Sequence, residues 1–177
     1  MNSKNTLLIT RAGKNDGWGN FYRISLIAKL LKKRNHNIVL FVIESKKAYF
    51  QAKKDFQTYY FNSNNKFKEN IIQQIINKSN KFEFDNIIIE LYRLDLKFQK
   101  NLYNLTKKLI ILDDLLNKNY FTDILICCQE NSNFTKYLNN TKNDVGKLFY
   151  GYKYFPIPYT KKIKFIHKRN VLISLGG

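Results

Sequence analysis

The stretch "FDNIIIELY", residues 84–92, decides the fold class of this chain. Its three consecutive isoleucines leave no polar position facing either side, which predicts a strand buried on both faces. Strands of this kind belong to parallel sheets whose two faces are covered by helices. The segments before and after it alternate between short apolar runs and helical patterns, as such a sheet requires.

Apolar runs elsewhere predict further buried strands, at 6–10, 37–43, 58–61, 108–114 and 123–128. Apolar residues at helical spacing predict helices at about 20–34, 45–56, 67–79 and 94–107. The sequence therefore predicts an α/β fold, a parallel sheet with helices on both faces. In such sheets ligands bind beyond the carboxyl ends of the strands, so the functional residues are expected there.

The chain has 177 residues and is 44% apolar, which suits one globular domain with a core of normal size. Its formal charge of +18 is compatible with a nucleic acid or an anionic membrane as partner. Only five of the 31 basic residues are arginine, however, and the lysines are scattered among residues that AT-rich codons encode. We therefore attribute the charge to genomic composition and expect no specific nucleic acid partner, with polyanion binding as an alternative.

No metal, cofactor or disulfide is expected from the sequence. Cys127 and Cys128 are adjacent, so on a strand they would point to opposite faces and would not support a disulfide framework. Two histidines are too few for a zinc-type cluster. No run approaches the ~18 apolar residues of a transmembrane helix, and "TLLIT" (6–10) is too short for a signal-peptide core. We therefore expect a cytoplasmic protein without a transmembrane segment.

The motif "GWGN", residues 17–20, lies between a predicted strand and a predicted helix. Gly17 and Gly19 would let a ligand approach the backbone closely, and the start of the helix would favour an anion. The third glycine of a dinucleotide-binding fingerprint is missing. A simple tight turn therefore remains an alternative, and Asn20 is expected to be the N-cap of the helix.

The two prolines of the chain occur together in "YFPIPYTKK", residues 154–162. Because proline favours an extended backbone, this segment is expected to lead out of a first domain. We therefore expect an N-terminal domain at 1–155, and at 156–177 an interdomain linker with the first strand of a missing C-terminal domain. Two alternatives stay open: a fragment of a longer protein, or a degenerate single domain.

Several segments, taken in order, resemble one family: "RAGKNDGWGNFYR" (11–23), "IIIELY" (87–92), "ILDDL" (111–115), "TDILIC" (122–127), "GYKYFPIP" (151–158) and "LISLGG" (172–177). This family comprises the UDP-sugar hydrolase of pseudaminic acid biosynthesis and the related spore coat polysaccharide proteins. The resemblance implies a Rossmann-like N-terminal domain of the GT-B glycosyltransferase type. It also implies a UDP-sugar as partner, and a C-terminal domain in a longer or separate chain.

The resemblance also implies which residues act. The substrate-binding candidates, to which Trp18 is added as a ring able to stack on a sugar or base, are Arg11, Gly17, Trp18, Gly19, Arg23, Glu90, Asp113 and Asp114. The catalytic candidates are Asn20 and Tyr92. In hydrolase members a histidine at the position of Asn20 is thought to act as general base, and an amide cannot take that proton. Hydrolysis is therefore expected to be impaired.

Three functions remain open on the sequence. The first is the acceptor-side domain of a sugar-nucleotide hydrolase or glycosyltransferase of surface polysaccharide (nonulosonic acid-type) biosynthesis. The second is a non-catalytic module that binds a sugar nucleotide or a partner. The third is a polyanion-binding protein, which predicts lysines gathered on one face. For Asp113 and Asp114, a loop-capping role is an alternative to a substrate role.

Overall fold

The computed structural model describes residues 3–13, 17–62, 69–92, 94–130 and 133–156. Within them, seven strands form one sheet in the order β3-β2-β1-β4-β5-β6-β7, and all neighbouring pairs are parallel. The strands are β1 (Asn5–Arg11), β2 (Asn37–Ile43), β3 (Gln57–Phe61), β4 (Asn86–Glu90), β5 (Leu109–Leu112), β6 (Phe121–Cys127) and β7 (Asp144–Tyr150). The helices are α1 (Gly19–Lys32), α2 (Lys46–Ala52), α3 (Glu69–Ser79), α4 (Leu96–Tyr103), α5 (Phe134–Leu138) and the short 3-10 helix η1 (Tyr152–Tyr154).

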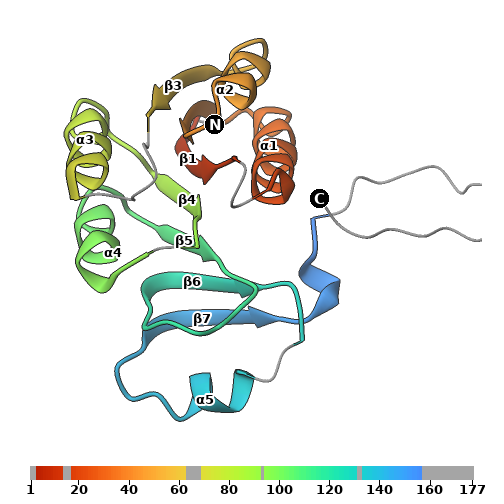
Figure 1. Cartoon of the computed structure of the whole chain (residues 1–177), viewed down its shortest axis with the longest axis vertical. Helices are drawn as coiled ribbons and strands as arrows, with labels where there is room; N and C mark the ends of the chain where they lie inside the picture. The colour runs from red at the N-terminus through yellow and green to blue at the C-terminus, as the bar shows by residue number, and fades with distance from the viewer. Residues whose placement is uncertain (1–2, 14–16, 63–68, 93, 131–132, 157–177) are drawn as a thin grey trace, which may run out of the picture.

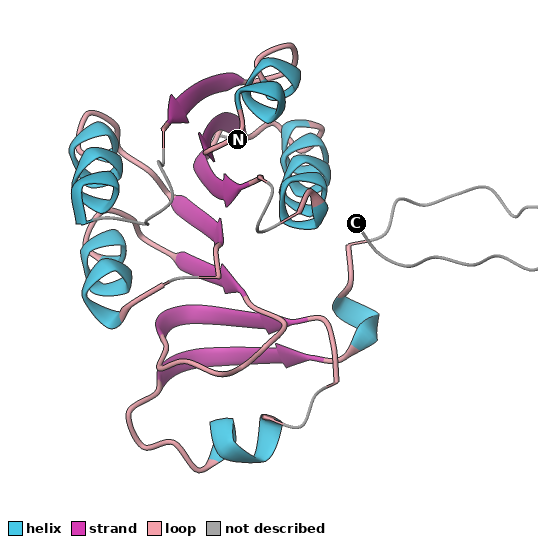
Figure 2. Cartoon of the chain, viewed as in Figure 1, coloured by secondary structure: helices cyan, strands magenta, loops and turns pink. Residues whose placement is uncertain are grey.

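The sheet is covered on both sides, with α1 and α2 on one face and α3 and α4 on the other (Figures 1 and 2). Alternation along each strand divides the apolar side chains between the two faces. Leu7 and Ile9 of β1 pack in the core next to α3 and α4, whereas Leu8 packs in the core next to α1 and α2. The expected α/β, Rossmann-like architecture is therefore confirmed.

Two elements near the end of the described chain were not expected from the sequence, namely β7 and α5. β7 reads "DVGKLFY" and lies at the edge of the sheet, where its side chains are half-buried or exposed. It therefore has no continuous apolar run of the kind that marks a central strand. α5 has only five residues, too few for a helical period to show in the sequence.

The start of α1 differs from the sequence prediction in one residue that matters for function. The N-cap position belongs to Trp18, whose side chain makes no capping hydrogen bond, so the prediction that Asn20 caps the helix is wrong. Gly17 has a φ of 65°, and it pairs with Gly13 in an isolated antiparallel bridge. The helix begins at Gly19, two residues after Gly17, so Asn20 lies in its first turn, where it is buried.

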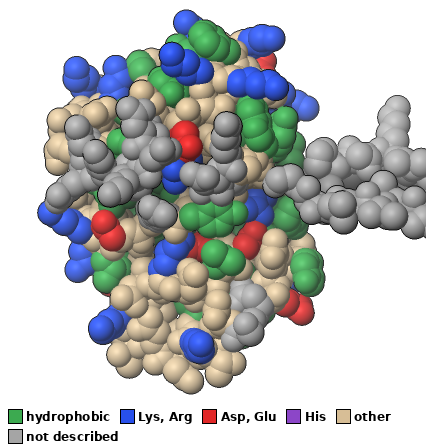
Figure 3. All heavy atoms as spheres, viewed as in Figure 1, with side chains coloured by type: hydrophobic (Ala, Val, Ile, Leu, Met, Phe, Trp, Pro, Cys, Tyr) green, Lys and Arg blue, Asp and Glu red, His purple; other side chains and the backbone are tan. Residues whose placement is uncertain are grey.

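The expected linker and strand at 156–177 lie outside the described residues, apart from Pro156. In the described part of the chain, no helix has both the length and the apolar character needed to cross a membrane. Lysine and arginine side chains are spread around the outline of the face in Figure 3, with acidic side chains between them. On this face they form no single basic patch of the kind that polyanion binding predicts.

The close packing of β6 against β7 generates a prediction for Gly146. A Cβ atom at this position would lie 2.8 Å from the backbone carbonyl oxygen of Asp123, which cannot swing aside. We expect Gly146→Ala to lower the free energy of unfolding by about 1–3 kcal/mol, as overpacking does. Thermal denaturation followed by circular dichroism measures the effect.

Gly19→Ala is the matched control for that measurement. A Cβ at Gly19 meets no atom within 4 Å, and alanine favours a helix. This variant should be as stable as the wild type or slightly more stable. Equal destabilisation by the two substitutions would contradict the packing described for β6 and β7.

Candidate functional site

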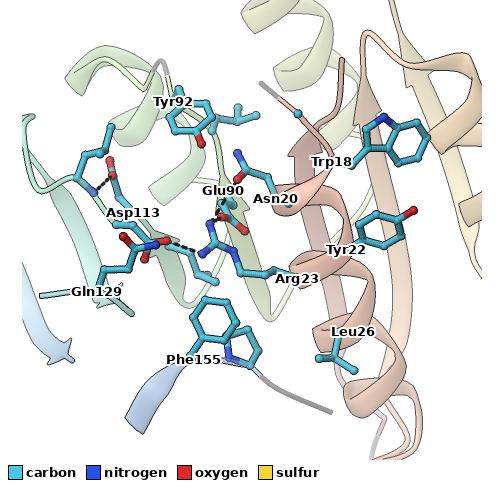
Figure 4. Close-up of a pocket in the computed structure, with 17 residues that line it drawn as sticks. Trp18, Asn20, Tyr22, Arg23, Leu26, Glu90, Tyr92, Asp113, Gln129 and Phe155 are labelled. Atoms are coloured by element: carbon cyan, nitrogen blue, oxygen red, sulfur yellow. Dashed lines mark hydrogen bonds and ion pairs between the residues drawn. The ribbon is translucent and has the colours of Figure 1, made fainter. Parts of the chain in front are cut away.

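A pocket of about 740 Å³ opens at the carboxyl ends of β1, β4 and β5, beside the first turns of α1 (Figure 4). This is the edge of the sheet where ligands of such folds bind. Its described lining comes from the last residues of β4 and β5, from the segments that follow β1, β4, β5 and β6, and from the end of the described chain. The lining residues are Gly17, Trp18, Gly19, Asn20, Tyr22, Arg23, Leu26, Glu90, Leu91, Tyr92, Leu112, Asp113, Asp114, Leu115, Gln129, Phe155 and Pro156.

A polar layer lies between the sheet and α1 at the floor of this pocket. Thr10 and Glu90 are register partners in neighbouring strands, so their side chains point to the same face of the sheet. Asn20 and Arg23 are three residues apart on α1, which places them on one face of the helix. The fold therefore brings residues from β1, α1 and β4 together within an otherwise apolar layer.

The guanidinium of Arg23 is the centre of this layer. Its Nη1 donates to Asp114 Oδ2, and its Nη2 donates to Glu90 Oε1. Nη2 also donates to Asn20 Oδ1 at 3.3 Å, so Asn20 accepts a hydrogen bond instead of capping the helix. The ring of Phe155 lies 5.6 Å from the guanidinium carbon. In Figure 4, Arg23 points from α1 toward Glu90, with Asn20 above it and Phe155 below.

Glu90 is buried and shares its cation with a second carboxylate. Burial raises the pKa of Glu90 to about 7, with Asp114 and Asp113 adding to the effect and Arg23 opposing it. The direction follows from burial, because removing the carboxylate from water disfavours its charged form by more than the ion pair with Arg23 restores. Glu90 can therefore gain or lose a proton near neutral pH inside the pocket.

The polar layer also contains open hydrogen-bonding positions. Four buried side-chain atoms in the described part of the chain lack a protein partner, and three of them belong to this layer: Thr10 Oγ1, Arg23 Nε and Glu90 Oε2. The fourth, Ser25 Oγ, also lies on α1. An unsatisfied buried polar group costs about 1–3 kcal/mol, so water or a ligand hydroxyl at these positions would stabilise the site.

Asp113 is engaged by the loop that it begins. Its Oδ1 accepts the backbone N–H of Leu115 at 2.9 Å, and its Oδ2 accepts from Lys118 Nζ and from the Tyr120 hydroxyl at 3.1 Å. This geometry favours the loop-capping alternative for Asp113. The sequence analysis did not single out Lys118 or Tyr120, because nothing in the spacing of a loop residue identifies its partner.

Arg11 is the candidate that the fold places apart from the pocket. Its Nε donates to Glu44 Oε2 at 2.5 Å, and both side chains are largely buried. Glu44 has a φ of 77°, an uncommon conformation for a residue other than glycine. Arg11 is not among the residues that line the pocket.

The other candidates line the pocket, together with residues that the sequence analysis missed. Trp18 packs its ring on Phe21 at 5.6 Å, over the start of α1. Tyr92 lies at the rim and is 45% exposed. The missed lining residues are Tyr22, Leu26, Leu91, Leu112, Leu115, Gln129, Phe155 and Pro156. For Tyr22 and Leu26, four-residue spacing from Trp18 along one helix was a usable signal.

Metal binding finds no support at this site or elsewhere in the described residues. No group of three or more histidine, cysteine or acidic side chains in that part of the chain could hold a metal ion. Glu90 and Asp114 face a guanidinium instead.

The fold and the position of the pocket define a Rossmann-like α/β domain with a pocket at the carboxyl edge of its parallel sheet. The chain is similar to a glycosyltransferase from Rickettsia africae ESF-5, whose crystal structure superimposes with a TM-score of 0.56 at 19% sequence identity. The match covers 84% of this chain but 42% of that chain, so this chain spans less than half of the other's length. No protein-family model and no curated protein matches the sequence.

The raised pKa of Glu90 generates a prediction for stability. Between pH 4.5 and about 7 the carboxyl is protonated in the folded state but ionised in the unfolded state. Unfolding then releases a proton, so the contribution of Glu90 to the free energy of unfolding falls as the pH rises, by about 3 kcal/mol in total. Glu90→Gln should remove this loss.

Urea denaturation at about pH 5 and about pH 8 measures the effect as the difference between wild type and Glu90→Gln at each pH. The variant should gain stability relative to the wild type as the pH rises. Glu83→Gln, at an exposed glutamate, is the control and should show no such gain. A Glu90→Gln difference that is the same at both pH values would contradict the raised pKa.

Proposed function

We propose that this chain is the sugar-binding, acceptor-side part of a glycosyltransferase-like protein that works on sugar nucleotides. The observation that carries the proposal is the buried cluster of Arg23, Glu90 and Asp114 at the floor of a pocket with an aromatic rim. Pockets for small ligands combine apolar walls with a few well-placed polar groups. The likeness to a glycosyltransferase supports the fold on which this proposal stands.

The rim of the pocket suits a sugar ring. Tyr22, Tyr92, Leu115 and Phe155 line the pocket and are 55%, 45%, 41% and 36% exposed. Aromatic side chains present an apolar face and, in tyrosine, a polar hydroxyl, which matches the mixed surface of a sugar. Exposed apolar side chains grouped around one pocket are also typical of a surface that another molecule or domain covers.

Glu90 is the residue that we propose as proton acceptor. Asn20 occupies the position at which the resemblance implies a histidine base, and its amide cannot take a proton. Glu90 lies beside it, since both accept hydrogen bonds from Arg23 Nη2. A carboxyl whose pKa burial raises to about 7 is suited to proton transfer near neutral pH. With Glu90 taking the proton of an acceptor hydroxyl, transfer of a sugar to that hydroxyl is feasible even where hydrolysis is impaired.

The pathway and the second domain complete the proposal. We propose surface polysaccharide biosynthesis of the nonulosonic acid type, on the sequence resemblance alone. We propose a partner domain in a longer or separate polypeptide on the same resemblance. That domain would hold the nucleotide across the pocket.

A non-catalytic binding module is the second candidate. The observation that favours it is Asn20, a non-titrating residue that is buried in the polar layer beside Arg23. Under this alternative the pocket binds a sugar, and Glu90 only positions Arg23.

Nuclear magnetic resonance of the ¹⁵N-labelled 177-residue chain tests the proposal, with UDP-N-acetylglucosamine and the uncharged methyl N-acetylglucosaminide as ligands. We expect saturable shifts at the amides of 17–23, 90–92 and 113–115. Tyr92→Ala should weaken binding roughly tenfold by removing a ring that covers the ligand. Tyr103→Ala, on α4, removes a similarly exposed ring outside the pocket and should leave binding unchanged.

The variant Glu90→Gln distinguishes the two candidate functions, catalysis and binding alone. If Glu90 takes a proton, the variant should bind the glycoside but lose any transfer to it once the partner domain is supplied. If neither ligand shifts these amides at millimolar concentration, the sugar-binding proposal is wrong.

A further inference from the structure

We propose that this pocket takes an uncharged, hydroxyl-bearing sugar and excludes phosphate, because Glu90 and Asp114 occupy Arg23, the one basic side chain among the described lining residues. The inference rests on the proposed function, since it names the chemical class of ligand for the same pocket. Under this inference Arg23, a substrate-binding candidate from the sequence, does not bind phosphate directly. The phosphates of a sugar nucleotide would then lie outside this pocket.

The balance of charges in the lining is the first argument. Arg23 is the only basic residue among the described lining residues, which include three acidic ones. The negative charge of Asp113 is compensated by Lys118, which donates to it and does not line the pocket. Arg23 is left facing both Glu90 and Asp114. A phosphate approaching Arg23 would have to displace a carboxylate that is itself largely buried.

The start of α1 is the feature that opposes this conclusion, because a helix N-terminus attracts anions. Its partial charge can be compared with the net charge of the three side chains. A helix N-terminus carries about half a positive charge. With Glu90 ionised, Arg23, Glu90 and Asp114 together carry one excess negative charge, which is larger. With Glu90 protonated they carry none. In neither state do the described lining residues offer the full positive charge that would hold a phosphate dianion.

The open hydrogen-bonding positions are the second, independent argument. Two atoms of lining residues, Arg23 Nε and Glu90 Oε2, are buried and lack a protein partner in the described part of the chain. One is a donor and the other a carboxyl oxygen, so a ligand needs both an acceptor and a donor to satisfy them. Sugar hydroxyls donate and accept, whereas an ionised phosphate mainly accepts. Glu90 is 3% exposed, so any group that reaches it is largely removed from water.

Removal of one carboxylate should convert the pocket into an anion site. In Asp114→Asn the side chain keeps an oxygen for the backbone N–H of Cys128, which Asp114 Oδ1 accepts at 3.0 Å, but loses its charge. Arg23 then has one carboxylate partner instead of two. We expect this variant to bind UDP and inorganic phosphate at least roughly tenfold more tightly than the wild type.

Isothermal titration calorimetry of the full chain at about pH 8, where Glu90 is mainly ionised, measures this change. Asp55→Asn is the matched control. It makes the same change of charge at a 48% exposed side chain that pairs with Lys29 outside the pocket, and should show no gain. If Asp114→Asn does not fold by circular dichroism, Glu90→Gln takes its place, because it removes the other carboxylate charge.

Two results would overturn the inference: phosphate binding by the wild type as tight as by the variant, or a folded variant of either kind without a gain. Methyl N-acetylglucosaminide in the same titrations keeps the two proposals apart. Gain of phosphate binding without glycoside binding supports the exclusion of anions and contradicts the sugar-binding function. Glycoside binding without a gain supports the function and contradicts the role of Glu90 and Asp114.

Discussion

The sharing of one guanidinium between two buried carboxylates is the constraint on which the chemistry of this pocket depends. Arg23 reaches from α1 to Glu90 at the end of β4 and to Asp114 after β5, and so ties the helix to two strands. Burial raises the pKa of Glu90 against the opposing effect of Arg23, and Asp114 adds to the rise, so Glu90 holds a proton up to about neutral pH. Because two carboxylates share one guanidinium, the described lining residues leave no free positive charge for an anionic ligand.

The fold accounts for this arrangement through ordinary rules of parallel sheets. All strands end at one edge, so residues far apart in the sequence meet there, and alternation turns Thr10 and Glu90 toward α1. The apolar layers beneath the pocket fix α1 in position over β1 and β4. Polar side chains at the top of these layers are thereby held in an environment poor in water. That environment raises the pKa of Glu90 and strengthens its interaction with Arg23.

The sequence predicted the sheet because its central strands are continuous apolar runs such as Ile87–Ile89, and it placed Glu90 and Asp114 at the expected edge. It could not predict which charges pair. Arg23 and Asp114 are 91 residues apart, and only the packing of α1 on the sheet brings them together. For the same reason it missed the pairing of Arg11 with Glu44. Local rules also failed at Asn20. This residue type suits an N-cap, but here it lies within the first turn of α1 and accepts a hydrogen bond from Arg23.

The most direct test of the account is a ¹³C nuclear magnetic resonance titration of the Glu90 carboxyl, assigned with Glu90→Gln. The account predicts an inflection at about pH 7 that reports the burial of Glu90 and the neighbouring carboxylates. In Asp114→Asn the inflection should move to lower pH, because one of those carboxylates no longer carries a charge. An inflection near the ordinary value of 4.5, unmoved in Asp114→Asn, would contradict the shared guanidinium and the ligand selectivity inferred from it.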